Sequence, residues 1–270
     1  MENIQQKQNT LEKTHQESSN SELQKIEGNT KTLDILTDTI RNMSALSEKS
    51  DKILEALFIY PDRSCRHVGK LSGRHMIHLD ENSNPFEVFC EQSMFGGGWT
   101  VIQHRFDGSI DFYRNWTEYR NGFGKLNGEF WLGLEYVHQI TRNRPHELLV
   151  EMKDFHGNYR YARYSQFEVG SESELYELTK LAPGSGTAGD AMGYNKNEKF
   201  STYDRDNDTD SGNCAKILHG AWWYWRCSVS NLNGRYKNST NDDSAMVFFN
   251  RKLDWRSMSY TRMMIRDIIN

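Results

Sequence analysis

The 270-residue chain lacks any apolar run long enough to cross a membrane, because no stretch approaches 18 consecutive apolar residues. It also lacks Gly-x-y repeats, which excludes a collagen-like segment. Lysine and arginine are not in excess, since the formal net charge is -4, so a nucleic-acid partner is not expected. The first thirty residues carry only scattered apolar side chains and no hydrophobic core of a secretory signal peptide. These side chains are Met1, Ile4, Leu11, Leu23 and Ile26.

Motifs of common enzymes are also missing. The sequence contains no GxSxG, HExxH or Walker motif, and its nine histidines form no spaced cluster. Residues 184–189 match GxGxxG, but Pro183 precedes them and no βαβ unit surrounds them, so a dinucleotide site is not expected. We therefore predict that the protein is not an enzyme.

The composition of the chain changes near Pro61. Residues 1–61 contain no tryptophan and one of the 20 glycines, whereas residues 62–270 contain all seven tryptophans. The N-terminal part also carries -3 of the formal net charge of -4. We predict an N-terminal segment over residues 1–61 and one globular domain over residues 62–270.

Apolar residues of the N-terminal segment recur at alternating spacings of three and four, which is the pattern of a coiled-coil seam. We predict that the protein forms a homo-oligomer through residues 26–57. The alternative is an amphipathic helix that packs on its own domain, and residues 1–20 are polar enough to be disordered. The seam positions are Ile26, Asn29, Leu33, Leu36, Ile40, Met43, Ser47, Ser50, Leu54 and Leu57.

The domain over residues 62–270 is predicted to be α+β, because short apolar runs are separated by Gly, Asn and Asp turns. Strands are predicted at residues 86–89, 99–102, 146–152 and 159–164. Helices are predicted at residues 116–119 and 129–139. Regular structure is expected to become sparse after about residue 183.

The four cysteines, Cys65, Cys90, Cys214 and Cys227, form no CxxC unit, so two disulfides are favoured over a zinc site. Three pairings are possible, and pairing of sequence neighbours would close short loops. Four free thiols in a cytosolic protein are the alternative.

Aspartates alternate along residues 204–210, shortly before Cys214. Hard oxygen ligands that converge on one tight turn are what a calcium ion requires. The spacing is not that of an EF-hand, because Thr209 and Ala215 occupy the places of its glycine and glutamate. We interpret the segment as a calcium site, with a solvated acidic loop as the alternative.

An aromatic run, Trp222, Trp223, Tyr224 and Trp225, lies next to Cys227. Such a run is usually part of a core, although lectins and peptide-binding pockets also use aromatic walls.

Residues 64–267 contain an ordered series of motifs that resembles the fibrinogen C-terminal domain family, which includes ficolins, tachylectins and angiopoietins. The motifs are GGGWTVIQHRFDGSIDFYRNWTEYRNGFG, LNGEFWLGLEYVHQIT, SGTAGDAMGYNKNEKFSTYDRDND, SGNCA, GAWWYWRC and SNLNGRY. The resemblance implies an α+β globular domain, in which an antiparallel sheet with short helices carries an irregular calcium and ligand subdomain. In this protein, the α-helical coiled coil would precede that domain.

The same resemblance implies two disulfides and one structural calcium ion. The disulfides would join Cys65 to Cys90 and Cys214 to Cys227. The calcium ligands would be the side chains of Asp206 and Asp208 and the carbonyl oxygens of Asp210 and Gly212.

A ligand pocket beside the calcium site is also implied, around a non-prolyl cis peptide bond between Arg226 and Cys227. Acetyl-binding members of the family enclose the acetyl methyl group with tyrosines and a histidine. Other residue types occupy the matching positions here, so weak or altered specificity is expected. The pocket residues would be Arg226, Cys227, Ser228, Leu218, Ser244, Ala245 and Arg256.

Together these features predict an extracellular, multivalent recognition protein that binds a glycan or a cell-surface protein, with a role in innate immune pattern recognition. The alternative is an angiopoietin-like signalling ligand of a cell-surface receptor. Secretion is expected although no signal peptide is visible. Of four Asn-x-Ser/Thr sequons, those at Asn115 and Asn238 are the candidate glycosylation sites.

Overall fold

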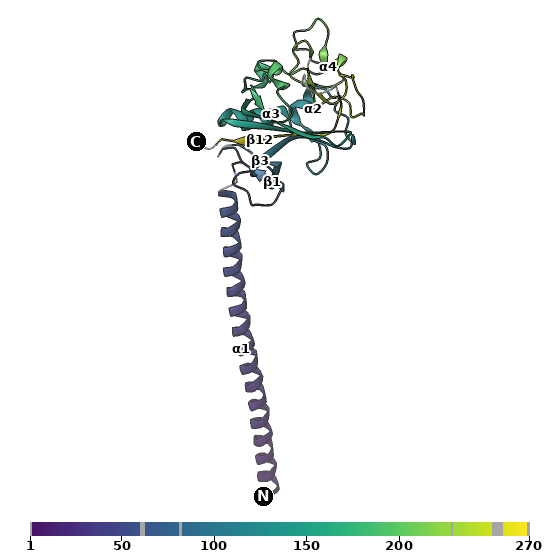
Figure 1. Cartoon of the computed structure of the whole chain (residues 1–270). Helices are drawn as coiled ribbons and strands as arrows, with labels where there is room; N and C mark the ends of the chain where they lie inside the picture. The colour runs from purple at the N-terminus through teal and green to yellow at the C-terminus, as the bar shows by residue number, and fades with distance from the viewer. Residues whose placement is uncertain (1, 60–62, 81–82, 228, 250–255, 269–270) are drawn as a thin grey trace. The chain divides into compact units, whose positions relative to one another are not determined.

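The computed structural model describes residues 2–59, 63–80, 83–227, 229–249 and 256–268. The protein separates into two compact units, Met1–Tyr60 and Pro61–Asn270. Figure 1 shows a single helix in the first unit and a twisted sheet with short helices and long loops in the second. Within the described ranges, no helix combines the length and the apolar character that a membrane span needs.

Helix α1 (Glu2–Ile59) is 58 residues long, which corresponds to about 87 Å at 1.5 Å per residue. The expectation that residues 1–20 are disordered is wrong over residues 2–20, because the helix begins at Glu2. This stretch contains neither proline nor glycine and is rich in Glu, Gln and Lys, which favour a helix. The described side chains of α1, at residue 7 and residues 9–50, are all exposed.

The second unit is built on an antiparallel sheet whose main strand order is β1-β2-β3-β12-β6-β7-β8. The four strands predicted from the sequence are confirmed as β2, β3, β6 and β7, and each extends beyond the predicted residues. The main strands are β1 (Gly73–Ile77), β2 (Phe86–Glu91), β3 (Trp99–Arg105), β6 (His146–Asp154), β7 (Tyr159–Glu168), β8 (Lys180–Leu181) and β12 (Met258–Asp267). The short strands are β4 (Phe123–Gly124), β5 (Phe130–Trp131), β9 (Gly184–Ser185), β10 (Ser230–Asn231) and β11 (Val247–Phe248).

Strand β12 closes the fold by lying between β3 and β6, near the middle of the sheet (Figure 1). Thr261 pairs with Arg105 of β3 on one side and with Met152 of β6 on the other. The sequence did not predict this strand, because Arg262 and Arg266 interrupt its apolar residues. Their guanidinium groups are accommodated by acidic partners on the neighbouring strands.

Arg262 links two buried carboxylates across the sheet. Its Nη1 donates to Glu91 Oε2 and its Nε donates to Glu151 Oε2, both at 2.8 Å. Burial alone would raise the pKa of Glu91, but hydrogen bonds from Ser93 and Arg262 outweigh burial and lower this pKa to about 2. Glu91 therefore remains ionised inside the fold, and its charge contributes to stability.

The helices of the second unit are short and surround the sheet. Helix α2 (Trp116–Asn121) confirms the helix predicted at residues 116–119. The helix predicted at residues 129–139 begins later, as α3 (Leu134–Asn143), because β5 comes first. Gly133 separates the two elements with φ of 115°, and a Cβ there would lie 2.9 Å from the backbone of Asn121. A side chain at this position would clash with the backbone of Asn121, and helix α3 therefore begins after Gly133.

The core is dominated by aromatic side chains. Trp223 is fully buried, with its ring centroid 5.1 Å from that of Phe200 and 5.2 Å from that of Trp222. Tyr224 is fully buried too, whereas Trp225 is 44% exposed. The aromatic run is thus core over its first three residues, and its last residue lies at the surface. Beyond residue 185 the regular elements before β12 are only two to four residues long, as expected.

Candidate functional site

Two disulfides join the cysteines in the order that the family resemblance implies. Cys65 is bonded to Cys90, with the Cα atoms 5.4 Å apart, and Cys214 is bonded to Cys227, with the Cα atoms 5.1 Å apart. No free cysteine is left among the four, all of which lie in the described residues. The second disulfide ties the start of α4 (Cys214–Ile217) to the end of the aromatic run.

The acidic loop is a series of turns closed by aspartate side chains. Asp208 Oδ1 accepts from the backbone N–H of Asp210 at 2.9 Å, and Asp210 Oδ1 accepts from Gly212 N–H at 3.0 Å. Asp206 Oδ1 makes a longer contact of 3.4 Å with Asp208 N–H. Each carboxylate thereby satisfies the N–H two residues later, which is why alternating aspartates suit this loop.

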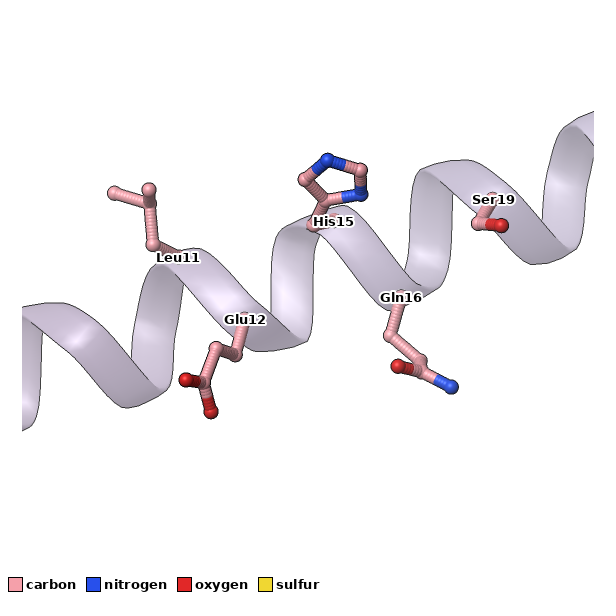
Figure 2. Close-up of a pocket in the computed structure, with 5 residues that line it drawn as sticks. All are labelled: Leu11, Glu12, His15, Gln16 and Ser19. Atoms are coloured by element: carbon pink, nitrogen blue, oxygen red, sulfur yellow. The ribbon is translucent and has the colours of Figure 1, made fainter.

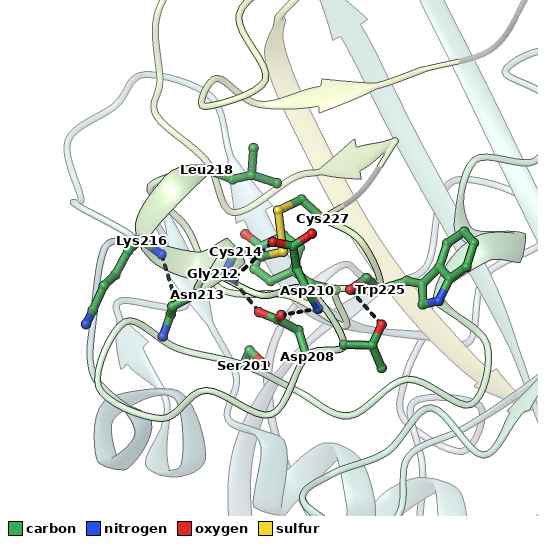
Figure 3. Close-up of a disulfide and its surroundings, with 12 residues drawn as sticks. Ser201, Asp208, Asp210, Gly212, Asn213, Cys214, Lys216, Leu218, Trp225 and Cys227 are labelled. Carbon is green, nitrogen blue, oxygen red and sulfur yellow. Dashed lines mark hydrogen bonds between the residues drawn. A yellow bond between two sulfur atoms is a disulfide. The ribbon is translucent and has the colours of Figure 1, made fainter.

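The loop is anchored on both sides of the Cys214–Cys227 disulfide (Figure 3). On one side, Asp208 Oδ2 accepts from Cys214 N–H at 2.9 Å. On the other side, Thr209 donates to the carbonyl oxygen of Trp225 through its N–H at 3.2 Å and its Oγ1 at 3.0 Å. The acidic loop is therefore linked to Trp225 by hydrogen bonds, and to Cys227 through Cys214 and the disulfide.

The donor atoms of this loop fit a calcium ion. Burial, followed by the nearby charge of Asp206, raises the pKa of Asp208, because the two carboxylates lie close together. The carbonyl oxygens of Asp210 and Gly212 accept no hydrogen bond from any residue that the structure describes. Two carboxylates and two unused carbonyl oxygens form a set of hard oxygen donors of the kind calcium prefers.

A second group of possible ligands in the same place does not fit a metal ion. A carboxylate oxygen of Asp210 and the sulfur atoms of Cys214 and Cys227 lie within 4.8 Å of one another. Because the two sulfur atoms are bonded to each other, neither is a thiolate that could ligate a metal. This group is therefore not a transition-metal site.

The expected pocket residues differ widely in exposure, and two of them are buried. Leu218 is 5% exposed and Ala245 is fully buried, whereas Arg226 is exposed. Ser244 is half-buried, and its hydroxyl donates to Asp242 at 2.6 Å. Ser228 lies outside the described residues.

Arg256 is held at a different place from the disulfide. Its Nη1 lies 4.0 Å from Asp154 Oδ2 at the end of β6, and its backbone bridges to Thr240. By contrast, Leu218 N–H donates to Cys214 O at 2.8 Å, which places it one helical turn from the disulfide.

The expected cis peptide bond between Arg226 and Cys227 is wrong, because the described residues contain no cis peptide bond. For a non-prolyl bond the trans form is lower in energy by about 3–4 kcal/mol. Here the trans backbone also closes a local turn, in which Trp225 N–H donates to Cys227 O at 2.9 Å.

The C-terminal globular domain of the fibrinogen beta and gamma chains is a family whose model matches residues 62–268. The protein belongs to this family. A curated relative, human Ficolin-3, is 46% identical over 178 residues, which cover 64% of this chain and 59% of the ficolin. The match thus spans less than two thirds of that relative's length.

Solved structures confirm the fold. The fibrinogen-like globe domain of human ANGPTL6 has a TM-score of 0.73 and 37% identity, covering 78% of this chain and 97% of that one. The corresponding globe of human ANGPTL2 has a TM-score of 0.72 and 37% identity, covering 77% of this chain and 99% of that one. Lamprey fibrin D-dimer, complexed with the peptide Gly-His-Arg-Pro-amide, has a TM-score of 0.66 and 28% identity, covering 93% of this chain and 94% of that one. The family and the ficolin likeness indicate a non-enzymatic recognition protein.

In this fibrinogen-like globe, meaning residues 62–270, Asn231 has a structural role that was not predicted from the sequence. Its Nδ2 donates to the carbonyl oxygens of Leu218 at 2.9 Å and Asp243 at 3.1 Å, so it joins the two segments that carry the expected pocket residues. A Cβ at Gly220 would lie 2.7 Å from Asn231 Oδ1, and one at Gly234 would lie 2.6 Å from Asn231 Nδ2. The motif SNLNGRY, which contains Asn231 and Gly234, was the available signal.

The exposed surface beside the acidic loop carries Trp225 and Arg226. The Arg226 guanidinium lies 5.7 Å from the centroid of the Trp225 ring, within the range of a cation–π contact.

The two candidate glycosylation sites differ in surroundings. Asn115 caps α2 by accepting from Glu118 N–H at 2.9 Å, whereas Asn238 is exposed. Glycosylation at either remains a prediction.

Proposed function

We propose that this protein is an extracellular, multivalent recognition protein, in which α1 clusters several fibrinogen-like globes and each globe binds a carbohydrate or protein ligand. Its family and its likeness to a ficolin favour a role in innate immune pattern recognition. Two disulfides favour an oxidising, extracellular location.

The observation that carries this proposal is the exposed apolar stripe of α1. Leu33, Leu36, Ile40 and Met43 are 54–66% exposed on a helix of 58 residues. Their spacing of three and four matches a coiled-coil seam, and burial of the stripe by further copies of α1 would stabilise an oligomer. Clustering of globes can strengthen binding by about 10² to 10⁴ when several sites engage at once.

Each globe is proposed to hold one structural calcium ion. Asp206 and Asp208 would supply carboxylate oxygens, and Asp210 and Gly212 would supply carbonyl oxygens. The ion would neutralise the crowded aspartates and stiffen the loop. Thr209 would transmit this order to Trp225, since both of its donors hold the Trp225 carbonyl oxygen.

Ligand binding is proposed beside this loop, with a reduced preference for acetylated sugars. A buried Leu218 and a small Ser244 offer little aromatic wall to an acetyl methyl group. The exposed N–H groups and side chains near Arg226 and Cys227 remain available as donors.

A second candidate function is an angiopoietin-like signalling ligand that binds a cell-surface receptor. The likeness to the ANGPTL6 and ANGPTL2 globes favours it. In that case the surface around Trp225 and Arg226 would contact a protein instead of a sugar.

Glycan arrays probed with the full-length protein, in calcium and in EDTA, test the proposal. We expect calcium-dependent binding to a set of glycans, and we expect Asp206→Ala to weaken it. A matched control, Asp38→Ala, removes an exposed acidic group from α1 and should bind as the unaltered protein does. Binding to cells after their surface glycans are removed, with no binding to any arrayed glycan, would favour the signalling ligand.

A further inference from the structure

The apolar stripe of α1 has a polar continuation toward the N-terminus. Leu33 follows His15 by 18 residues, which is five whole turns at 3.6 residues per turn, so both side chains leave the helix in the same direction. Ile26 and Ile40 deviate from this line by only about 20° on either side. His15 therefore lies on the face that the proposed function assigns to contact with other copies of α1.

His15 borders an open groove on this face of the helix (Figure 2). The groove is also lined by Leu11, Glu12, Gln16 and Ser19, all of them exposed. Figure 2 shows Glu12 and His15 leaving the helix ribbon on different sides. The two residues are three positions apart, as adjacent a and d positions of a coiled-coil seam are.

The heptad register gives the same result independently of the groove. Glu12 precedes Ile26 by two heptads, and His15 precedes Asn29 by two heptads. In a parallel coiled coil, both residues therefore occupy core positions, where each faces its own counterpart on the neighbouring helices.

The chemistry of these two side chains suits a metal ion. Glu12 and His15 form a Glu-x-x-His unit, a spacing with which helical bundles present a carboxylate and an imidazole to metal ions in their interior. Two helices would bring together two imidazoles and two carboxylates, and three helices would bring three of each. Either number provides the four ligands of a tetrahedral zinc ion. Without a cation, the glutamates of adjacent copies would repel one another in the seam.

We propose that Glu12 and His15 of neighbouring copies form an interchain site for a divalent transition-metal ion, with Zn2+ as the ion to test. The site rests on the proposed function, since a single copy supplies only one imidazole and one carboxylate. Its ligands differ from the all-oxygen donors of the calcium loop, so calcium does not compete for it. Metal that binds only the assembled form stabilises the oligomer by mass action.

The test uses the full-length protein, stripped with EDTA and returned to saturating Ca2+. Zinc is titrated by calorimetry and counted by mass spectrometry after desalting, and light scattering gives the subunit number. We expect one zinc ion per oligomer, and a zinc dissociation constant raised roughly tenfold or more in both His15→Ala and Glu12→Gln. Gln16→Ala, which alters the groove without removing a ligand, should bind zinc as the unaltered protein does.

A swap variant provides the composition-matched control. Thr14→His combined with His15→Thr keeps every residue type but turns the imidazole by about 100° away from the seam. This variant should lose the tight zinc site while circular dichroism shows unchanged helix content. Oligomers that bind zinc equally well with and without the swap would overturn the zinc site alone. A protein that stays monomeric with and without zinc would overturn the coiled coil as well.

Discussion

Removal of one proposed calcium ligand, Asp206→Ala, gives the sharpest test of the acidic loop. Asp206 is exposed, and its hydrogen bond with Asp208 N–H is 3.4 Å long, so its loss should change stability little in chelator. Asp208 is less informative, because its carboxylate also accepts from Asp210 N–H and Cys214 N–H. Loss of those two bonds would destabilise the globe with or without calcium.

The expected gain from calcium follows from mass action. A loop with two carboxylate ligands should bind calcium in the weak extracellular range, with a dissociation constant of about 10⁻⁴ to 10⁻³ M. At about 10 mM calcium, the unaltered globe should therefore gain about 1.4 to 2.7 kcal/mol over its stability in chelator. For a domain of this size, that corresponds to roughly 3 to 11 °C in melting temperature. Asp206→Ala should lose most of this gain.

Calorimetric melting of residues 62–270 in calcium and in EDTA measures the effect, since isolated globes of this family have been solved. Asp210→Ala is the matched control, because it also removes one exposed aspartate but keeps the carbonyl oxygen that is the expected ligand. It should retain most of the calcium gain and show a small loss in both solutions. The reasoning is refuted if Asp206→Ala keeps the full calcium gain.

Three further predictions concern the sheet, the helix and the pocket. Because the pKa of Glu91 is lowered to about 2 from an ordinary 4.5, the ionised carboxylate adds to the free energy of unfolding above pH 4.5. This contribution is lost as the pH falls toward 2. Urea unfolding should thus show a cost of about 3 kcal/mol for Glu91→Gln at pH 7 that shrinks in acid, whereas exposed Glu87→Gln should cost under about 1 kcal/mol throughout. Light scattering should find several subunits for the full-length protein but one for residues 62–270, and equal subunit numbers would contradict the coiled coil. Calorimetry of the globe with N-acetylglucosamine should give a millimolar or weaker dissociation constant, since loss of two or three aromatic contacts costs about 1 to 4 kcal/mol. A micromolar dissociation constant would contradict the expected loss of aromatic contacts.

Local sequence patterns were enough to predict the elements that do not depend on distant partners. Strands β2, β3 and β6 contain short apolar runs between turns, and β7 is rich in tyrosine, so β-structure follows from local residue types. The disulfides and the acidic loop were predictable because dense motifs place them within known neighbours. In α1, the spacing of apolar residues was enough to predict a helix over residues 26–57, but not its polar start, because helix propensity competes there with a low apolar content.

Features that depend on distant partners were not predictable. Strand β12 contains two arginines, and only the carboxylates of Glu91, Glu147 and Glu151 on other strands make it suitable for the middle of a sheet. The carbonyl oxygen of Leu218 likewise finds its hydrogen-bond donor in Asn231, which is 13 residues away. Charge pairing and side-chain to backbone links of this kind leave no periodic pattern in the sequence.

Different interactions hold the sheet and the loop region together. The sheet is held by continuous backbone pairing and by buried ion pairs such as Arg262 with Glu91. The segment between β9 and β12 has little backbone pairing, and the Cys214–Cys227 disulfide, the acidic loop and the Asn231 side chain hold it together instead. Those links fix the backbone near Trp225 and Arg226, but they do not involve the side chains of these two exposed residues. Substitution at these positions should therefore cost little in stability. Under the proposed function it would alter ligand specificity, and weak individual sites would still be useful if α1 brings several of them together.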